Sequence, residues 1–272
     1  PVKIISEAET IIEKSLVHLE TVHSPRTMAF AIKGLYYQQI AKQSAQKTEL
    51  ITTFANRLVQ LYKNESSLKW EWFEGYLTYA NSTLPEAMLY AWLLTGEEIY
   101  KKIALSSLIF LLSKTFNKNG IEVISNKKWL KRGQKAGKYG EQPIDVAYTI
   151  MTLSKFYDVF KDEEYLRKMN TAFNWFLGSN RLHQIIYNPS TGGCYDGLEE
   201  THVNLNQGAE STVSYLMARL TIEKYTNTKS PTKAKTKKHI RRQKEQRKPV
   251  FSTDYKKETD QPFSVSLPLH FD

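Results

Sequence analysis

Signals that begin helices recur at nearly equal spacing along this chain, and this repeat limits its possible folds more than any other feature. Pro25, Pro85 and Pro143 each stand in the first turn of an expected helix, where proline's missing N–H removes no hydrogen bond. A fourth helix begins near Gly208, so the successive starts are 60, 58 and 65 residues apart. A unit of this length holds two helices, which makes a helical hairpin the repeating unit.

Apolar residues within these units recur three or four positions apart, as in Leu50, Phe54, Leu58 and Leu61. This spacing places them on one face of a helix, and few alternating runs are present that would indicate strands. The pattern predicts an all-α protein with eight helices. Their expected ranges are 7–22, 25–42, 48–63, 84–95, 97–114, 143–160, 163–177 and 208–225.

Every second connection between these helices is long. Residues 64–83, 115–142 and 178–207 form the long connections, whereas the turns near Gly96 and at 158–162 are short. Because antiparallel helices alternate in direction, the long connections are expected at one end. We therefore predict an α/α toroid, in which inner helices surround a pocket and a loop-rich rim carries the site.

An open solenoid of helix pairs is the alternative architecture. Four hairpins are too few to close a ring of six. The sequence therefore predicts a ring that is incomplete, that lacks an N-terminal part, or that another chain completes.

Composition and charge divide the chain into a globular body and a tail. A hydrophobic content of 41% and an aromatic content of 12% exclude a wholly disordered protein. Residues 226–249 contain ten Lys or Arg and one Glu, a balance of +9 out of a net +10. We predict a helical domain at 1–225, a basic flexible segment at 226–249 and an extended tail at 250–272. The basic segment is expected to contact anionic surfaces, but not nucleic acid, because no recognition motif or interleaved aromatic residue accompanies the charge.

Several classes of site and location are not expected. The single cysteine, Cys194, excludes an internal disulfide and a thiolate zinc cluster, and the six histidines lack metal-ligand spacing. No phosphate-binding glycine motif occurs, so we expect neither a metal nor a cofactor. The most apolar stretch, 103–112, is too short to cross a bilayer, and no signal-peptide pattern is visible, which predicts a cytoplasmic location. The chain begins at proline, so it can be a fragment.

The first long loop, KWEWFEGYLTYANSTLPEA, alternates aromatic residues with carboxylates and amides. Sugar rings stack their C–H faces on aromatic rings, while their hydroxyls need directed donors and acceptors. We therefore predict that Trp72, Glu74, Tyr79 and Asn81 bind a saccharide. The alternative is that the aromatic rings only seal the helix ends.

The second long loop ends in KYGEQPIDVAYT, where Glu141 and Gln142 precede a helix and Asp145 lies in its first turn. The aligned peptide dipoles stabilise a carboxylate there, which suits a base, a nucleophile or an acceptor for sugar hydroxyls. Helix capping alone is the alternative explanation. We predict Glu141 as a catalytic residue, and Gln142 and Asp145 as substrate-binding residues.

The third long loop, YNPSTGGCYDGLEETHVNLNQGAES, leads into the last helix. Asp196, Asn206 and Glu210 are expected to project toward the same rim as Glu74 and Glu141. Asn206 is predicted to bind substrate. Glycoside hydrolysis needs two carboxylates, and their separation decides inversion or retention. We predict that Glu141 forms this pair with Glu210 or Asp196.

Four stretches together resemble a bacterial six-hairpin, glycosidase-like domain of the kind attached to, or encoded beside, glycosyltransferases. They are WEWFEGYLTYANSTLPEAML, EQPIDVAY, AFNWFLGSNR, and YNPSTGGCYDGL followed by VNLNQGAEST, spread over roughly residues 25–225. The resemblance implies an α/α toroid with a carbohydrate-related role. The family favours an aspartate where this chain has Ala80, and DQQP where it has Gly140, Glu141 and Gln142. The missing carboxylate at position 80 argues against catalysis, although Glu141 keeps the acid function.

Two functional hypotheses follow, from different classes. The first is a protein that binds or processes a saccharide at the rim, as a glycoside hydrolase or a glycosyltransferase-associated enzyme. The second is a non-catalytic accessory domain that docks on a glycosyltransferase domain or subunit. A third reading makes the basic segment a binder of anionic polymers or membrane surfaces, with an affinity that falls steeply with salt.

Overall fold

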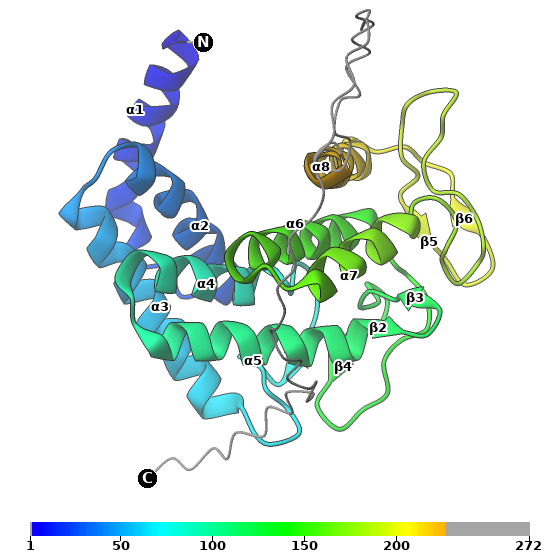
Figure 1. The fold of residues 1–272 in the computed structure, drawn as a ribbon, viewed down its shortest axis with the longest axis horizontal. Coiled ribbons are helices and arrows are strands. Elements are labelled where there is room, and N and C mark those ends of the chain that lie inside the picture. The colour runs from blue at the N-terminus through cyan, green and yellow to red at the C-terminus, as the bar shows by residue number, and fades with distance from the viewer. Residues whose placement is uncertain (1, 227–272) are drawn as a thin grey trace, which may run out of the picture. The chain divides into compact units, whose positions relative to one another are not determined.

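Helices account for most of residues 2–226, the part of the chain that the computed structural model describes (Figure 1). The helices of this part are α1 (Val2–Leu19), α2 (Pro25–Ala41), α3 (Ala45–Glu65), α4 (Thr83–Thr95), α5 (Glu98–Thr115), α6 (Pro143–Phe160), α7 (Glu163–Asn174) and α8 (Ala209–Thr226). They confirm the predicted all-α class and the predicted order of elements. The basic segment predicted at 226–249 lies outside the described residues apart from Thr226, and so does the whole tail predicted at 250–272.

Most helices differ from the predicted ranges by one to five residues at an end, and two of the C-terminal ends have local reasons. Helix α1 ends at Leu19 rather than at position 22, before the extended backbone of Ser24 that precedes Pro25. Helix α7 ends at Asn174 rather than at 177. There the backbone N–H of Trp175 donates to the carbonyl of Ala172, so the last turn tightens.

The helices form two layers. Helices α2, α4, α6 and α8 pack side by side in that order as an inner layer, and α3, α5 and α7 each pack on the inner helix that precedes them in sequence. Figure 1 shows α1 to α4 on the left and α6 to α8 on the right of this series. The repeating unit is therefore the predicted helical hairpin, arranged as in part of an α/α toroid.

Helix α4 shows most clearly why these segments are buried. Every residue from Thr83 to Ala91 is buried, because α4 lies between α2 and α6 and is covered by α3 and α5. Gly96 ends this helix in a left-handed conformation with φ 78°, which glycine adopts without a steric penalty. The chain can then reverse within a short turn and begin α5.

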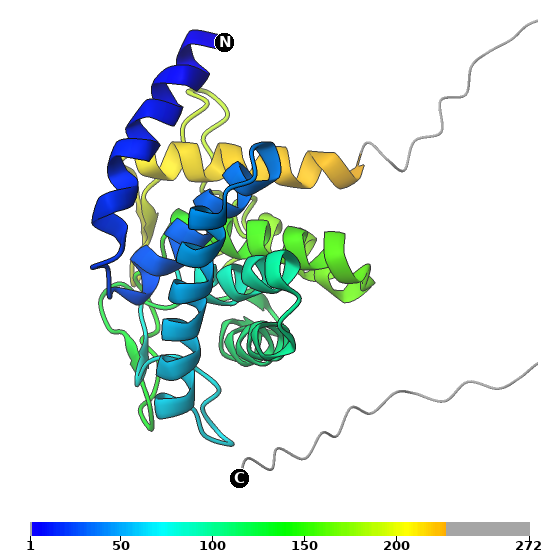
Figure 2. The ribbon, with the colours of Figure 1, turned by 90° about the vertical axis from the view of Figure 1, so that its left-hand side faces the viewer.

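The three long connections contain short antiparallel ribbons and contact one another. Strand β1 (Tyr76–Leu77) pairs with β4 (Leu130–Lys131), β2 (Phe116–Asn117) with β3 (Gly120–Ile121), and β5 (Gly197–Leu198) with β6 (Val203–Asn204). The pairing of β1 with β4 joins the first loop to the second, and a bridge between Glu141 and Leu198 joins the second to the third. Figure 2 shows these connections gathered at the left, with α6 and α7 running away from them. The long loops therefore share one end, as predicted.

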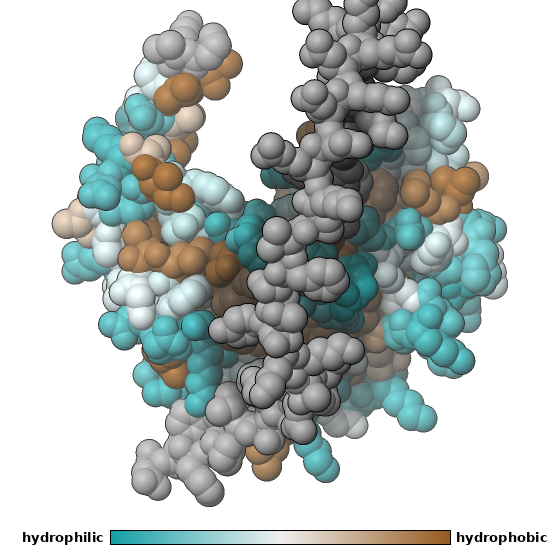
Figure 3. Space-filling view, viewed as in Figure 1, coloured by the Kyte–Doolittle hydropathy of each residue, from teal (hydrophilic) through white to brown (hydrophobic). Residues whose placement is uncertain are grey.

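The edge helices of this arrangement keep apolar side chains at the surface. Ile4 and Ile11 on α1 are 71% and 66% exposed, and Leu220 on α8 is 61% exposed. Figure 3 shows apolar surface along α1 at the upper left. Within residues 2–226, no helix is both long enough and apolar enough to cross a membrane.

Candidate functional site

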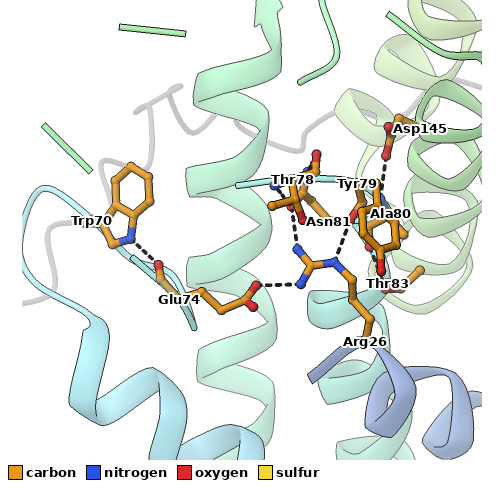
Figure 4. A network of polar contacts seen from close by, with 9 residues as sticks. All are labelled: Arg26, Trp70, Glu74, Thr78, Tyr79, Ala80, Asn81, Thr83 and Asp145. Carbon is orange, nitrogen blue, oxygen red and sulfur yellow. Dashed lines mark hydrogen bonds and ion pairs between the residues drawn. The ribbon is translucent and has the colours of Figure 1, made fainter. Parts of the chain in front are cut away.

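A buried arginine joins the start of α2 to the loop that precedes α4 (Figure 4). The Nη1 atom of Arg26 lies 2.7 Å from Oε2 of Glu74, and both side chains are buried. Its Nε donates to the carbonyl of Tyr79 at 2.7 Å, and its Nη2 donates to Oδ1 of Asn81 at 3.2 Å. One loop thus supplies three hydrogen-bond acceptors to a single guanidinium, whose planar group holds its N–H donors in fixed directions.

The same loop turns sharply at Ala80 and Asn81. Oδ1 of Asn81 accepts from the N–H of Thr78 at 3.0 Å, and its Nδ2 donates to the Thr78 carbonyl at 2.9 Å. Ala80 adopts a left-handed conformation with φ 48°, and its N–H donates to Oδ1 of Asp145 at 2.6 Å. This turn places the loop directly against the first turn of α6, as Figure 4 shows.

Asp145 is a buried carboxyl at the loop-rich end of the inner layer, with only 7% of its surface exposed. Burial raises its pKa to about 7, although the N–H of Ala80 and the charge of Arg26 act in the opposite direction. The nearby charge of Glu210 raises the pKa further. Near neutral pH this carboxyl therefore exists in both protonation states and can donate or accept a proton.

Partly exposed aromatic side chains lie on the same helices and loop as Arg26 and Asp145. Tyr79 is 57% exposed, with the guanidinium carbon of Arg26 5.2 Å from its ring centroid. Phe30 follows Arg26 by one helical turn, is 40% exposed, and lies 5.7 Å from the ring of Tyr148. Tyr148 in turn stands one turn after Asp145 on α6. Two contacts, Arg26 with Tyr79 and Phe30 with Tyr148, thus join residues spaced one helical turn apart on α2 and α6, and Asp145 lies one turn before Tyr148.

Glu210 completes this group from the fourth inner helix. It is exposed in the first turn of α8, and its charge raises the pKa of both Asp145 and Tyr148. For Tyr148, burial is the larger cause. We call these residues the rim cluster: Arg26, Phe30, Tyr79, Asp145, Tyr148 and Glu210.

Glu141 contacts a different part of the molecule. Its Oε2 accepts from Nε1 of Trp175 at 2.9 Å, and its Oε1 lies 3.6 Å from Nε of Arg181. Burial raises its pKa to about 7, against the effects of Trp175 and Arg181. Oε1 of Glu141 and Nε of Arg181 are both buried without a hydrogen bond in the described part of the chain. Its predicted pairing with Glu210 or Asp196 stays a prediction, because its observed partners come from the end of α7 and the third loop.

Asp196 binds the start of α8, and Asn206 binds Asp196. Asp196 Oδ1 accepts from the N–H of Gly208 at 2.9 Å and from Oγ of Ser211 at 2.7 Å, and its Oδ2 accepts from the Asn206 amide. Partial desolvation raises the pKa of Asp196, but these hydrogen bonds outweigh it and hold the pKa below its usual value. Gln142 is the N-cap residue of α6, and its side chain makes no capping hydrogen bond.

Trp72 lies in the core rather than at the surface. Its side chain is fully buried, with an exposed fraction of 0%, and its ring packs edge-on against Phe73. Its Nε1 has no hydrogen-bond partner in the described residues. The structure thus offers no accessible face of Trp72, and the exposed ring of this loop in the rim cluster is Tyr79.

Sequence reasoning missed Arg26, Phe30 and Tyr148 as members of the cluster. A signal for Arg26 was available, because a cation in the first turn of α2 opposes the helix dipole and needs a carboxylate partner if it is buried. Phe30 and Tyr148 carry no such signal, since aromatic residues at helical spacing normally indicate core. No cluster of side chains that could hold a metal ion occurs among residues 2–226.

Comparisons with known proteins bear on the fold. No family model matches the chain. No curated protein matches it either. Among solved structures it is similar to an inactive variant of the alpha-1,6-mannanase GH76A of Salegentibacter sp. HEL1_6, with two consecutive aspartates replaced by asparagine, in complex with alpha-1,6-mannotriose.

This match has a TM-score of 0.55 at 15% identity and covers 74% of the present chain and 54% of the mannanase. The present chain thus spans about half the length of that structure. The likeness shows the fold, which is that of part of an α/α toroid.

Proposed function

We propose that this chain binds a saccharide at the rim cluster. The observation that carries the proposal is a group of partly exposed aromatic rings near two carboxyl groups. Phe30, Tyr79 and Tyr148 offer accessible ring surface, and Asp145 and Glu210 supply acceptors beside it. Pyranose rings need this combination, because their C–H faces are apolar and their hydroxyls need directed partners.

The location of the cluster agrees with this proposal. It lies at the loop-rich end of the inner helices, where three long loops contact one another. The mannanase of similar fold is described in complex with mannotriose, which supports a saccharide as the ligand here as well. The sugar identity and the whole protein's activity are part of the proposal.

A glycoside hydrolase reaction is the catalytic form of this proposal. Asp145 has a pKa of about 7 and would act as the general acid, while the exposed Glu210 would act as the base or nucleophile. The sequence contains no two consecutive aspartates. The two residues replaced to inactivate the mannanase variant therefore have no counterpart here as an adjacent pair, and Asp145 with Glu210 would take their place.

The test is binding of α-1,6-mannotriose and a panel of neutral oligosaccharides to the full chain, measured by saturation-transfer NMR and calorimetry. Tyr79→Ala should weaken binding about fivefold, since ring stacking is worth about 1 kcal/mol. Asp145→Asn should abolish any turnover while the folded structure persists. Trp129→Ala is the matched control, because Trp129 is an exposed aromatic residue that stacks on Tyr76 instead. Equal affinity of the Tyr79→Ala variant and the unchanged chain would refute the site.

Association with a glycosyltransferase and a cytoplasmic location stay predictions. Co-purification of the full chain with a nucleotide-sugar-dependent transferase from its native cells would support the first. Its failure would leave the rim-cluster proposal standing.

A further inference from the structure

Polar and aromatic side chains continue from the rim cluster along the inner helices. On α2, Lys33 and Tyr37 follow Phe30 on the same helical face, and on α6, Thr152 and Lys155 follow Tyr148. Contacts confirm the alignment, since Phe30 lies beside Tyr148 and Lys155 lies over Tyr36. Seven residues of helix correspond to about 10 Å, so Lys155 stands about that far from the rim.

The two lysines of this face have different partners. Lys33 Nζ lies 2.9 Å from Oε1 and 3.0 Å from Oε2 of Glu86, whose Oε2 also accepts from Thr152. Lys33 is therefore neutralised by a buried carboxylate. Lys155 makes no ion pair and no hydrogen bond within residues 2–226.

Lys155 instead rests on aromatic rings. Its Nζ lies 5.0 Å from the ring centroid of Tyr90 and 5.4 Å from that of Tyr36. Burial lowers its pKa, while the charges of Asp158 and Glu86 oppose this effect. Glu86 is already bound to Lys33, and Asp158 accepts from the Tyr225 hydroxyl at 3.1 Å.

Tyr37 adds a hydroxyl at the edge of this group. It is 52% exposed, and its oxygen lies 2.7 Å from the hydroxyl of the buried Tyr90. A half-buried ammonium on two rings keeps N–H bonds for a further acceptor, and partial desolvation strengthens its attraction for an anion. Lys155 therefore supplies a cation, and Tyr37 a nearby hydroxyl, that can bind the same negatively charged group.

We propose that Lys155 and Tyr37 form a subsite for an anionic group, a carboxylate or a phosphate, carried by the saccharide that binds at the rim cluster. This inference rests on the proposed saccharide function and narrows it to acidic sugars. The neutral part of the ligand would contact Tyr79, Phe30 and Tyr148, and its charged group would reach Lys155.

Matched ligands test the subsite in the full chain. Galacturonic acid oligomers are compared with the same oligomers methyl-esterified at the carboxylate, and hexose 6-phosphates are compared with the parent hexoses. At low salt the charged member of at least one pair should bind about tenfold more tightly. Whichever pair shows this preference identifies the anion as a carboxylate or a phosphate.

Variants then assign the preference to one residue. Lys155→Met should give equal affinity for the charged and neutral members, and Lys155→Arg should keep most of the preference. Lys101→Met is the matched control, because Lys101 also lies over an aromatic ring, 4.7 Å from the Trp92 centroid, but on the outer helix α5 and beside Glu98. Far-UV circular dichroism verifies that each variant is folded.

Three results would overturn the subsite. They are a charged-ligand preference that persists in Lys155→Met, an equal loss in Lys101→Met, and the absence of any preference in the unchanged chain. In each of these cases the proposed function stands if neutral oligosaccharides still bind the unchanged chain and bind the Tyr79→Ala variant less tightly. Absence of binding by all ligands would refute both.

Discussion

At the scale of single residues, Arg26 has the largest expected influence on the candidate site. It contacts three predicted ligand-binding residues of one loop, because it binds the side chains of Glu74 and Asn81 and the carbonyl of Tyr79. Removing one partner of a buried ion pair leaves the other charge buried and uncompensated. The exposure of Tyr79 therefore depends on a residue of a different helix.

Arg26→Met should lower the free energy of unfolding by about 3–5 kcal/mol, because Glu74 would be left without its partner. Urea denaturation followed by circular dichroism measures this change. Arg167→Met is the control, since Arg167 pairs with Glu164 at an exposed position and should change stability by less than about 1 kcal/mol. Similar losses in the two variants would contradict a structural role for the buried pair.

At the scale of elements, the junction between the second and third loops depends on close backbone approach. Strand β5 begins at Gly197, which has φ 150°, and a Cβ atom there would lie 2.2 Å from the carbonyl oxygen of Glu141. The N–H of Leu198 donates to that same carbonyl at 3.0 Å. Only glycine permits this approach, so the joining of the two loops depends on it.

Gly197→Ala should therefore destabilise the protein by about 3 kcal/mol, through a clash with backbone that cannot move independently. Gly96→Ala provides the comparison, because Gly96 also has a positive φ, 78°, but a Cβ there meets no atom within 4 Å. That variant should lose only about 1 kcal/mol, from backbone strain alone. Thermal unfolding of both variants separates the clash from the strain, and equal losses would argue against close packing at the junction.

At the scale of the whole molecule, two buried carboxyls make stability depend on pH. Folding raises the pKa of Asp145 from 3.8 to about 7 and that of Glu141 from 4.5 to about 7, chiefly by burial. The folded state therefore binds more protons than the unfolded state between these values. Stability should consequently fall as pH rises through this window, and the loss should be complete above the raised pKa values.

The slope should be about 1.4 kcal/mol per pH unit for each group within its window. Asp145→Asn should remove its share of the slope, and adding Glu141→Gln should flatten the profile further. Denaturation at a series of pH values measures this. The pKa of Glu164 is lowered chiefly by hydrogen bonds from Arg167 and Lys168, so Glu164 acts in the opposite direction only below its ordinary value of 4.5, at the acidic edge of this window. An unchanged slope in both variants would show that neither carboxyl is protonated on folding.

Local signals in the sequence were sufficient to predict the helices and their pairing. The proline at the start of α2 and of α6 and the repeat of apolar residues depend only on neighbours within a few turns. The order of short and long connections then placed the loops at one end. This information is local, and the observed helices differ from the prediction only at ends such as those of α1 and α7.

The membership of the candidate site was less predictable. Tyr79 and Asp145 were both expected at a rim, and the N–H of Ala80, the residue after Tyr79, donates to Asp145 across 65 residues. Trp72 stands in the same aromatic and acidic pattern as Tyr79, yet it is buried in the core. Alternation of residue types cannot distinguish these two positions, because a buried ring and an exposed ring can occupy the same sequence pattern.

The sequence by itself therefore determined the helical class, the hairpin repeat and the end of the molecule at which the loops gather, since each depends on short-range hydrogen bonding and periodicity. Only the tertiary structure decided which polar groups meet. Arg26 pairs with Glu74 across 48 residues, Glu141 contacts Trp175, and Lys155 rests on Tyr36 and Tyr90. The physical reason is that burial and charge pairing depend on distances between side chains that are remote in sequence.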